Sequence, residues 1–384
     1  MIVEHLSLAD FRNYASAEVS LVAGANVFVG RNGQGKTNLA EAIGYLATLG
    51  SHRVSQDAPL VRADQNAAFV RARLGHAERH VQLEIQINRT GANKARVNGA
   101  PVKPSELPRY AQVVLFAPED LQIVRGDPSS RRRFADQLLT QLSPRLSGVI
   151  ADYDRVLKQR TALLKSARAR GIRGESLSTL DVWDDKLVSL GAELIRGRLR
   201  LADELAGPLT SAYSAIAGAD HQPTASWALS IGGIDPEEDE APAGEMSWDP
   251  AAIEEQFREA LASHRAAELE RGLTLVGPHR DDLTLRVRGL PVKGFASHGE
   301  SWSVALALRL ASAQLLRERS SLGDPVLILD DVFAELDADR RARLADLVVG
   351  FEQVIVTAAV EEDVPAALRA RTVRVEAGTI VEDA

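Results

Sequence analysis

The stretch VFVGRNGQGKTNLAEA (residues 27–42) decides the fold, because it joins an apolar strand, a glycine-rich loop and the start of a helix. The loop fits the pattern G-x-x-x-x-G-K-[ST] through Gly30, Gly35, Lys36 and Thr37. Glycines let the backbone curl until its N–H groups point at phosphates, and the helix that follows adds its positive end. The stretch therefore predicts a phosphate-binding loop (P-loop) for a nucleoside triphosphate.

Two side chains of the P-loop have separate predicted roles. Lys36 would neutralise charge on the β- and γ-phosphates, and the Thr37 hydroxyl would bind Mg²⁺. An ordinary glycine-rich turn is the alternative, but the strand, the loop and an amphipathic helix over 36–49 come in the order that a nucleotide site requires. The predicted phosphate cradle is the run Gly30, Arg31, Asn32, Gly33, Gln34, Gly35, Lys36, Thr37 and Asn38.

The composition is that of a globular protein. The chain has 384 residues, 45% hydrophobic and 26% charged, which allows two or three domains. No apolar run approaches the roughly 18 residues that a membrane span needs, and the first residues, MIVEHLSLADFRNY, lack the basic and apolar regions that a signal peptide is expected to have. The absence of cysteine excludes disulfides and fits a cytoplasmic protein. Because the formal net charge is −8, affinity for nucleic acid has to come from local basic surfaces.

Hydrophobic periodicity divides the chain into strand-rich and helix-rich parts. Residues 1–30 and 67–102 alternate apolar and polar side chains, which predicts strands, with a two-residue hairpin turn at Asn98–Gly99. Helical stripes cover 129–170, 177–217 and 250–271, and strand patterns return after residue 272. We therefore predict an α/β fold: the N-terminal part of a head (1–128), a mostly helical arm insertion (129–271) and the C-terminal part of the head (272–384).

A second part of the nucleotide site is predicted at VLILDDVFAELD (residues 326–337). A buried apolar strand that ends in carboxylates is where P-loop proteins hold their metal, partly through water. Asp330 would take that role. Neighbouring side chains on a strand diverge, so Asp331 would face the attacking water as its polarising base. A strand that ends in an aspartate-rich turn is the alternative.

A third part is predicted at ASHGESWSVALALRLASAQLL (residues 296–316). Ser297 and Glu300 have the spacing of a helix N-terminal capping box. The Ser-x-Gly motif of Ser297 and Gly299, about 25 residues before the Asp-Asp strand, also resembles the signature of ABC-type ATPases. That resemblance implies that Ser297 and Gly299 reach the γ-phosphate held by the P-loop of a second copy. Two copies would then sandwich two nucleotides, so that ATP joins a homodimer.

With these residues in view, the chain resembles the RecF family of bacterial recombination-repair proteins, relatives of the SMC and Rad50 ATPase heads. The resemblance runs from end to end. Besides the P-loop it rests on LSLADFRNY (6–14), FAPEDLQIVRGDPSSRRRFAD (116–136), TLVGPHRDDL (274–283), ASHGE (296–300) and LILDDVFAELD (327–337).

The resemblance implies an ABC-type ATPase head with ATP and Mg²⁺ as cofactors. Lys36, Asp330 and Asp331 would be the catalytic residues, with Thr37 and Asp330 as the Mg²⁺ ligands, and AELD (334–337) would be the D-loop at the dimer interface. It also implies a weak, DNA-dependent ATPase that acts as a switch in DNA repair, replication restart and the SOS response. Its DNA would be gapped DNA with single-strand/double-strand junctions. RecR and RecO would be partners in loading the RecA recombinase.

Three positions depart from the family pattern. Glu300 stands where the family usually has glutamine, and we expect it to turn back into the capping box, because a carboxylate beside a γ-phosphate would be repelled. Thr357 stands where ABC relatives often have a switch histidine. FAPEDL has no glutamine for a Q-loop, and Gln122 lies slightly late. We therefore expect slow hydrolysis.

Basic residues gather in two places that predict contacts with DNA. The stretch 155–173 holds seven Lys and Arg and no Asp or Glu, and a triple Arg precedes it. Lys and Arg on phosphates carry no base specificity, which suits recognition of DNA structure. A solvated helix face and internal salt bridges are the alternatives. The predicted DNA contacts are Arg131, Arg132, Arg133, Lys158, Arg160, Lys165 and Arg168.

Other functions remain open from the sequence. The ATPase subunit of a membrane ABC transporter carries the same nucleotide motifs, but the helical insertion and the RecF-type segments disfavour it. Another SMC-like DNA-processing ATPase is a further alternative. The acidic, Pro- and Gly-containing segment DPEEDEAPAGE (235–245) predicts an exposed loop, and the role of His279 stays open.

Overall fold

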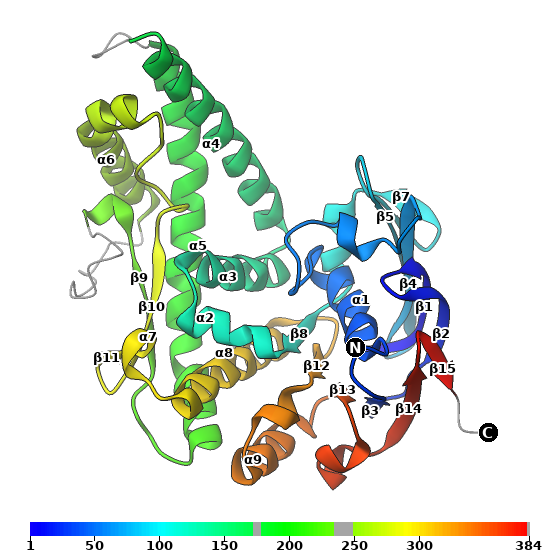
Figure 1. Ribbon diagram of the computed structural model, residues 1–384. Coiled ribbons are helices and arrows are strands. Elements are labelled where there is room, and N and C mark those ends of the chain that lie inside the picture. The colour runs from blue at the N-terminus through cyan, green and yellow to red at the C-terminus, as the bar shows by residue number, and fades with distance from the viewer. Residues whose placement is uncertain (172–177, 234–248, 382–384) are drawn as a thin grey trace. The chain divides into compact units, whose positions relative to one another are not determined.

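The computed structural model describes residues 1–171, 178–233 and 249–381, so the acidic segment 235–245 lies outside the described residues (Figure 1). The chain forms two compact units. The head unit comprises Met1–Leu121, Ser211–Asp220 and Trp302–Ala384, and the arm unit comprises Gln122–Thr210 and His221–Ser301. The arm unit thus extends to Ser301, beyond the predicted limit at 271, because a strand over 282–287 pairs with a strand over 224–228 of the insertion.

The first sheet of the head unit carries the predicted nucleotide motifs. Its strand order is β15-β14-β3-β13-β12-β8, and the five strands from β14 to β8 run parallel to one another. Every residue of β12 is buried, as predicted for a strand covered on both faces. The strands are β3 (Gly24–Val29), β8 (Val113–Phe116), β12 (Val326–Asp330), β13 (Gln353–Ala358), β14 (Arg371–Glu376) and the antiparallel β15 (Thr379–Val381).

The second sheet of the head unit is antiparallel, as the alternating pattern predicted. Its order is β2-β1-β4-β5-β6-β7. Asn98 and Gly99 join the last two strands with positive φ values of 50° and 79°, which confirms the predicted two-residue turn. The strands are β1 (Ile2–Phe11), β2 (Tyr14–Ser20), β4 (Ala67–His76), β5 (Arg79–Asn88), β6 (Lys94–Val97) and β7 (Ala100–Val102).

Helix α1 (Lys36–Thr48) shares one hydrophobic core with both sheets. Leu39 and Ile43 of α1 belong to the same buried cluster as Val70 of β4 and Ile328 of β12. This packing fixes the start of α1 directly after the P-loop. The other helices of the head unit are η1 (Ala58–Leu60), η2 (Pro104–Arg109), η3 (Pro118–Asp120), η5 (Val332–Glu335), α9 (Ala338–Val348), η6 (Glu361–Asp363) and η7 (Ala366–Leu368).

The arm unit is mostly helical, as predicted. Leu146 near the start of α4 packs on Gly197 of α5, whereas Leu164 near the end of α4 clusters with Leu180 at the start of α5, so the two helices form an antiparallel hairpin. Helix α6 joins that cluster through Leu269. The helices are α2 (Leu121–Arg125), α3 (Pro128–Leu142), α4 (Arg145–Ala169), α5 (Ser178–Ala217), η4 (Ser230–Gly232), α6 (Pro250–Arg271), α7 (Val292–Phe295) and α8 (His298–Arg319), of which α5 and α8 continue into the head unit.

A small antiparallel sheet completes the arm unit, with the order β11-β10-β9. Its strands are β9 (Thr224–Ala228), β10 (Asp282–Val287) and β11 (Leu290–Pro291). Across the described ranges, none of the helices combines the length and the hydropathy needed to cross a bilayer.

Candidate nucleotide-binding site

The P-loop connects the carboxyl end of β3 to α1, and two of its glycines are required by their surroundings. A Cβ on Gly30 would lie 2.2 Å from the carbonyl oxygen of Val375. Gly35 has a φ of 121°, and a Cβ there would lie 2.7 Å from the hydroxyl oxygen of Tyr14. Larger residues at these positions would force the loop open, so the loop geometry depends on glycine. The first N–H groups of α1, at Lys36 and Thr37, have no intrahelical partner, because no helical turn precedes them. They can therefore bind an anion.

The FRNY segment holds the P-loop from one side. Tyr14 donates its hydroxyl hydrogen to the Gly35 carbonyl at 3.1 Å, and Asn13 Nδ2 donates to the Gln34 carbonyl at 2.9 Å. The Asn38 side chain in turn donates to Asn13 Oδ1 at 2.7 Å. The sequence indicated FRNY only as a feature of the family. In the structure, two residues of this segment hold the P-loop through hydrogen bonds.

The β14–β15 turn holds the P-loop from the other side. The backbone N–H of Gly378 donates to the Gln34 carbonyl at 2.9 Å, and the N–H of Ala377 donates to Gln34 Oε1 at 2.5 Å. Gln34 therefore receives bonds from segments more than 300 residues apart in the chain. A loop fixed in this way is preorganised for its ligand, which lowers the entropy cost of binding.

The metal side of the site brings P-loop and β12 together. Thr37 Oγ1 donates to Asp330 Oδ1 at 2.9 Å, and Asp330 is only 3% exposed. Lys36 Nζ donates to the Arg31 carbonyl at 3.3 Å, inside the loop. A hydroxyl and a carboxylate beside a phosphate cradle are the oxygen ligands with which proteins hold Mg²⁺ together with phosphates and water. These residues therefore fit a nucleoside triphosphate with Mg²⁺.

Thr357 at the end of β13 links the two carboxylates. Its hydroxyl donates to Asp330 Oδ1 at 2.6 Å and accepts the backbone N–H of Asp331 at 3.0 Å. The sequence indicated only that Thr357 replaced a histidine. Its structural role could not be deduced from the sequence, because the contact joins residues 27 positions apart on neighbouring parallel strands.

Asp331 differs from Asp330 in its surroundings. Its backbone is left-handed with a φ of 52°, and its side chain is only half-buried. Burial raises the pKa of the Asp331 carboxyl, the neighbouring negative charge of Asp330 raises it further, and Lys36 opposes both. A carboxylate with a raised pKa is a stronger base, which suits the predicted role of polarising a water molecule.

The signature tip, residues 297–300, opens helix α8 and forms the predicted capping box. The Glu300 N–H donates to Ser297 Oγ at 3.2 Å, and the Ser297 N–H donates to Glu300 Oε2 at 2.9 Å. Arg288 adds an ion pair to Glu300 at 2.8 Å. These hydrogen bonds from Ser297 lower the pKa of Glu300, and Arg288 lowers it further. The expectation that Glu300 turns back into the cap is thus confirmed.

The start of the signature tip is exposed in the described structure, as contact with a second copy requires. Ser297 is exposed and Gly299 is half-buried, and Phe295 just before them is 66% exposed. In the predicted D-loop, Ala334 and Glu335 are exposed as well, while Asp337 caps α9 by accepting the N–H of Arg340 at 2.9 Å. An exposed aromatic side chain beside a motif of this kind is typical of a contact surface.

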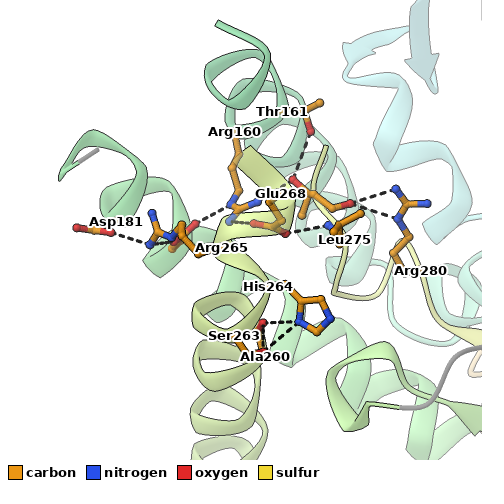
Figure 2. Close-up of polar contacts among 12 residues, drawn as sticks. Arg160, Thr161, Asp181, Ala260, Ser263, His264, Arg265, Glu268, Leu275 and Arg280 are labelled. Atoms are coloured by element: carbon orange, nitrogen blue, oxygen red, sulfur yellow. Dashed lines mark hydrogen bonds and ion pairs between the residues drawn. The ribbon is translucent and has the colours of Figure 1, made fainter. Parts of the chain in front are cut away.

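Two predicted DNA contacts are wrong, because their guanidinium groups pair with carboxylates inside the arm unit. Arg131 is buried and binds both carboxylate oxygens of Asp282 at 2.7 Å. Arg160 is fully buried, donating to Asp184 and Glu268 at 2.6 Å each and to Thr274 Oγ1 at 2.9 Å (Figure 2). Both residues stabilise the arm unit and are not available to a phosphate.

The other predicted DNA contacts differ in accessibility. Arg132 is half-buried and donates to the Asp281 carbonyl at 2.7 Å, so it also supports the arm unit. Arg168 is exposed and donates to the carbonyl of Arg271 at 3.1 Å, the last residue of α6. The remaining three, Arg133, Lys158 and Lys165, are exposed, and they stay predictions together with Arg168.

The GPHRDD segment is structural in the arm unit. His279 Nε2 donates to the Thr274 carbonyl at 3.2 Å, so in the neutral ring Nδ1 accepts the hydroxyl hydrogen of Tyr153 at 2.8 Å. Asp281 is fully buried and accepts both the N–H and the hydroxyl hydrogen of Ser230 at 2.9 Å. Both ring nitrogens of His279 are thus engaged within the protein, which answers the open question about its role.

Two titrations in this segment predict opposing effects of acid on arm stability. Burial lowers the pKa of His279 from 6.5 to about 3, so between these values only the unfolded chain binds the proton, and stability falls as pH falls. Burial raises the pKa of Asp281 from 3.8 to about 6, so in that window the folded state holds the extra proton and acid stabilises. At about pH 5 the His279 contribution costs on the order of 2 kcal/mol.

We therefore expect His279→Gln to flatten the loss of thermal stability between about pH 7 and pH 5, and Asp281→Asn to steepen it. Thermal unfolding of both variants at the two pH values, compared with the unmodified chain, measures this. Equal pH slopes for all three proteins would contradict the assignment.

Comparison with known proteins agrees with this architecture. Residues 2–381 match the family described as RecF/RecN/SMC N terminal domain. A DNA replication and repair protein RecF from Leifsonia xyli subsp. xyli is 61% identical over 383 residues, covering 100% of both chains. Another from Clavibacter michiganensis subsp. michiganensis is 59% identical over 388 residues, covering 100% of this chain and 96% of the relative.

Solved structures extend the comparison. A structure of the recombination mediator protein RecF-ATP in the RecFOR pathway is 26% identical, with a TM-score of 0.86 and coverage of 100% and 97% of the two chains. An Smc head domain with an extended coiled coil from Pyrococcus furiosus shares the fold alone, at 16% identity and a TM-score of 0.52 over 98% and 94%. The predicted α/β ABC-type ATPase head is thereby confirmed. The chain belongs to the RecF family of DNA replication and repair proteins, within the wider RecF/RecN/SMC group.

Proposed function

We propose that this chain is an ATP-dependent DNA-binding protein of recombinational repair and replication restart, and that ATP binding closes a homodimer. The observation that carries the proposal is the 2.9 Å contact between the Thr37 hydroxyl and Asp330. That contact brings the P-loop and the carboxylate strand together as a P-loop ATPase needs them. A relative of the same family was solved with ATP, which supports ATP as the nucleotide.

Different residues of the chain have different proposed roles at the nucleotide. Lys36 and the N–H groups of the P-loop bind and orient the phosphates, and Thr37 and Asp330 hold the Mg²⁺ site. A bound Mg²⁺ would neutralise part of the phosphate charge. Asp331 polarises the attacking water by accepting its hydrogen bond. The tip at Ser297 and Gly299 of a second copy covers the γ-phosphate with the positive end of helix α8.

Nucleotide state then sets the dimer equilibrium. Shifting such an equilibrium from mostly open to mostly closed needs a differential affinity of about 10⁴, or about 5.5 kcal/mol. Two γ-phosphates, each contacted by both copies through charged or helix-end groups, are a source of that energy. Hydrolysis removes the group that both copies hold, so turnover opens the dimer. The protein would thus be a slow, DNA-dependent ATPase that works as a switch.

DNA and partner proteins complete the proposal. The DNA is gapped DNA with a single-strand/double-strand junction, contacted through exposed cations such as Arg133, Lys158, Lys165 and Arg168. Each phosphate neutralised on duplex DNA steepens the log–log salt dependence of binding by about 0.9. RecR and RecO are the proposed partners in loading the RecA recombinase in the cytoplasm. The RecFOR pathway of the solved relative supports these partners.

Sizing the protein in solution tests the proposal. We expect a dimer with ATP, and a monomer with ADP or without nucleotide. Gapped DNA should bind more tightly to the dimer. Lys36→Arg should keep the fold and lose hydrolysis, so that DNA release after ATP depletion slows. A single size under all three nucleotide conditions would contradict an ATP-gated dimer.

A further inference from the structure

A segment that follows helix α1 returns to the nucleotide site. After the end of α1 at Thr48 the chain turns back along the helix, and Ser51 Oγ donates to Glu41 at 2.5 Å. Arg53 donates to Asn38 Oδ1 at 2.8 Å, close to the start of the helix. These anchors lie on either side of His52 in the sequence and hold the segment without using the imidazole ring.

The ring of His52 reaches the carboxylate of Asp330. His52 Nε2 lies 3.7 Å from Asp330 Oδ2, and the side chain is 13% exposed. The other oxygen, Asp330 Oδ1, is already taken by the hydroxyls of Thr37 and Thr357. His52 therefore lies at the one oxygen of Asp330 that these two hydroxyls leave open.

His52 Nε2 is shielded from solvent and has no hydrogen-bond partner within the described residues. At 3.7 Å, Asp330 Oδ2 is beyond the reach of a normal hydrogen bond. Leaving a buried polar atom unpaired costs about 1–3 kcal/mol, and such atoms in folded proteins are rare. A group that arrives with the ligand would satisfy this nitrogen. Mg²⁺ retains several waters when a protein binds it through one or two carboxylates, so a metal-bound water has the required chemistry.

We propose that His52 is a positioning residue of the nucleotide site, whose Nε2 hydrogen-bonds to a water of the Mg²⁺ shell beside Asp330. The inference rests on the proposed ATP–Mg²⁺ function and extends it to a residue outside the P-loop and the Asp-Asp strand. Partners of this kind orient the metal's ligands, and their loss typically lowers metal affinity or activity by 10–100-fold. His52 acts through a water of the metal and does not contact the reacting phosphate.

Two amide variants separate the positioning role from a packing role. The amide of glutamine reaches the place of Nε2, whereas the amide of asparagine reaches only the place of Nδ1. We expect His52→Asn to raise the Mg²⁺ concentration for half-maximal binding of a fluorescent ATP analogue by about tenfold or more. His52→Gln should stay within a few-fold of the unmodified chain. Affinity for the analogue in EDTA should be the same for all, because the P-loop is unchanged.

His264→Asn is the matched control, since among the described residues His264 on α6 bonds to Ser263 and the Ala260 carbonyl, both in the arm unit (Figure 2). It should leave the Mg²⁺ midpoint unchanged. Equal midpoints for His52→Asn and His52→Gln, or a midpoint for His52→Asn within twofold of the unmodified chain, would overturn the assignment. Failure of the unmodified chain to bind the analogue at all would instead count against the proposed function.

Discussion

Replacing Asp331 with asparagine is expected to lower ATP hydrolysis by about 10²–10⁴-fold, the usual contribution of a general base. The amide keeps the size of the carboxylate but cannot accept a proton from water. The Thr357 hydroxyl still receives the backbone N–H of residue 331, because that bond does not involve the side chain. ATP binding and the ATP-dependent dimer should therefore persist. Single-turnover hydrolysis, measured beside the affinity for a fluorescent ATP analogue, separates the two effects.

Asp330→Asn is the comparison that assigns the two carboxylates. The Asp330 carboxylate accepts the hydroxyl hydrogens of Thr37 and Thr357 through one oxygen and is a proposed ligand of Mg²⁺. Replacing this carboxylate should therefore raise the Mg²⁺ concentration that ATP binding requires, as well as slow hydrolysis. Asp331→Asn should leave the Mg²⁺ requirement near that of the unmodified chain. The division of roles would be refuted by an Asp331→Asn protein that hydrolyses ATP within fivefold of normal.

Arg160→Met is expected to destabilise the arm unit by about 3–5 kcal/mol, the usual cost of breaking a buried ion pair from one side. Glu268 is fully buried, and the substitution removes the guanidinium that contacts its Oε2 at 2.6 Å. Its other oxygen accepts the N–H of Leu275 at 2.8 Å (Figure 2). Adding Glu268→Gln neutralises the charge while an amide oxygen can still accept that N–H. The double variant should therefore recover most of the loss.

Hydrogen exchange of the backbone amides of α4 and α6 measures the free energy of opening of the arm unit by itself. The measurement does not assume that both units unfold together. Arg168→Met on the exposed side of α4 is the matched control and should stay within about 0.5 kcal/mol. A loss below about 1 kcal/mol for Arg160→Met would show that the buried pair is not a principal tie of the arm unit.

The elements of the fold were largely predictable, because their signals are local. The pattern predicted a helix over 250–271, and α6 spans Pro250–Arg271. Asp249 caps its start and Gly272 ends it in the left-handed conformation, and both are standard helix boundary residues. Likewise the apolar run before Asp330 predicted the buried strand β12, which pairs with β8 and β13.

The fate of charged residues was not predictable, because their partners are distant in the chain. Arg160 and Lys165 stand in one cationic stretch without a nearby acid, yet Arg160 is buried and Lys165 is exposed. The carboxylates that neutralise Arg160 belong to Asp184 and Glu268, 24 and 108 residues away. Hydrophobic periodicity gives the face of a helix, but a buried arginine on that face cannot be told from a solvated one without its partner.

The nucleotide site shows the same division. The P-loop, Asp330, Asp331 and the capping box at Ser297 follow from short motifs that carry their own chemistry. The supporting contacts of Tyr14, His52 and Thr357 are long-range, and the motifs do not indicate them. His52 in particular follows a helix that leaves the site, and only the folding back of residues 51–53 returns it to Asp330.

The central claim is that each ATP is held jointly by the P-loop of one copy and the signature tip of another. The chain contains no cysteine, so single-cysteine variants carry no background reactivity. Asn32→Cys and Ser297→Cys proteins, both carrying Asp331→Asn to retain ATP, are mixed and treated with a short bis-maleimide. The account predicts a crosslinked dimer with ATP and Mg²⁺, little with ADP, and little from either cysteine variant alone. No nucleotide-dependent crosslink in the mixture, or equal crosslinking by one variant alone, would contradict the shared site.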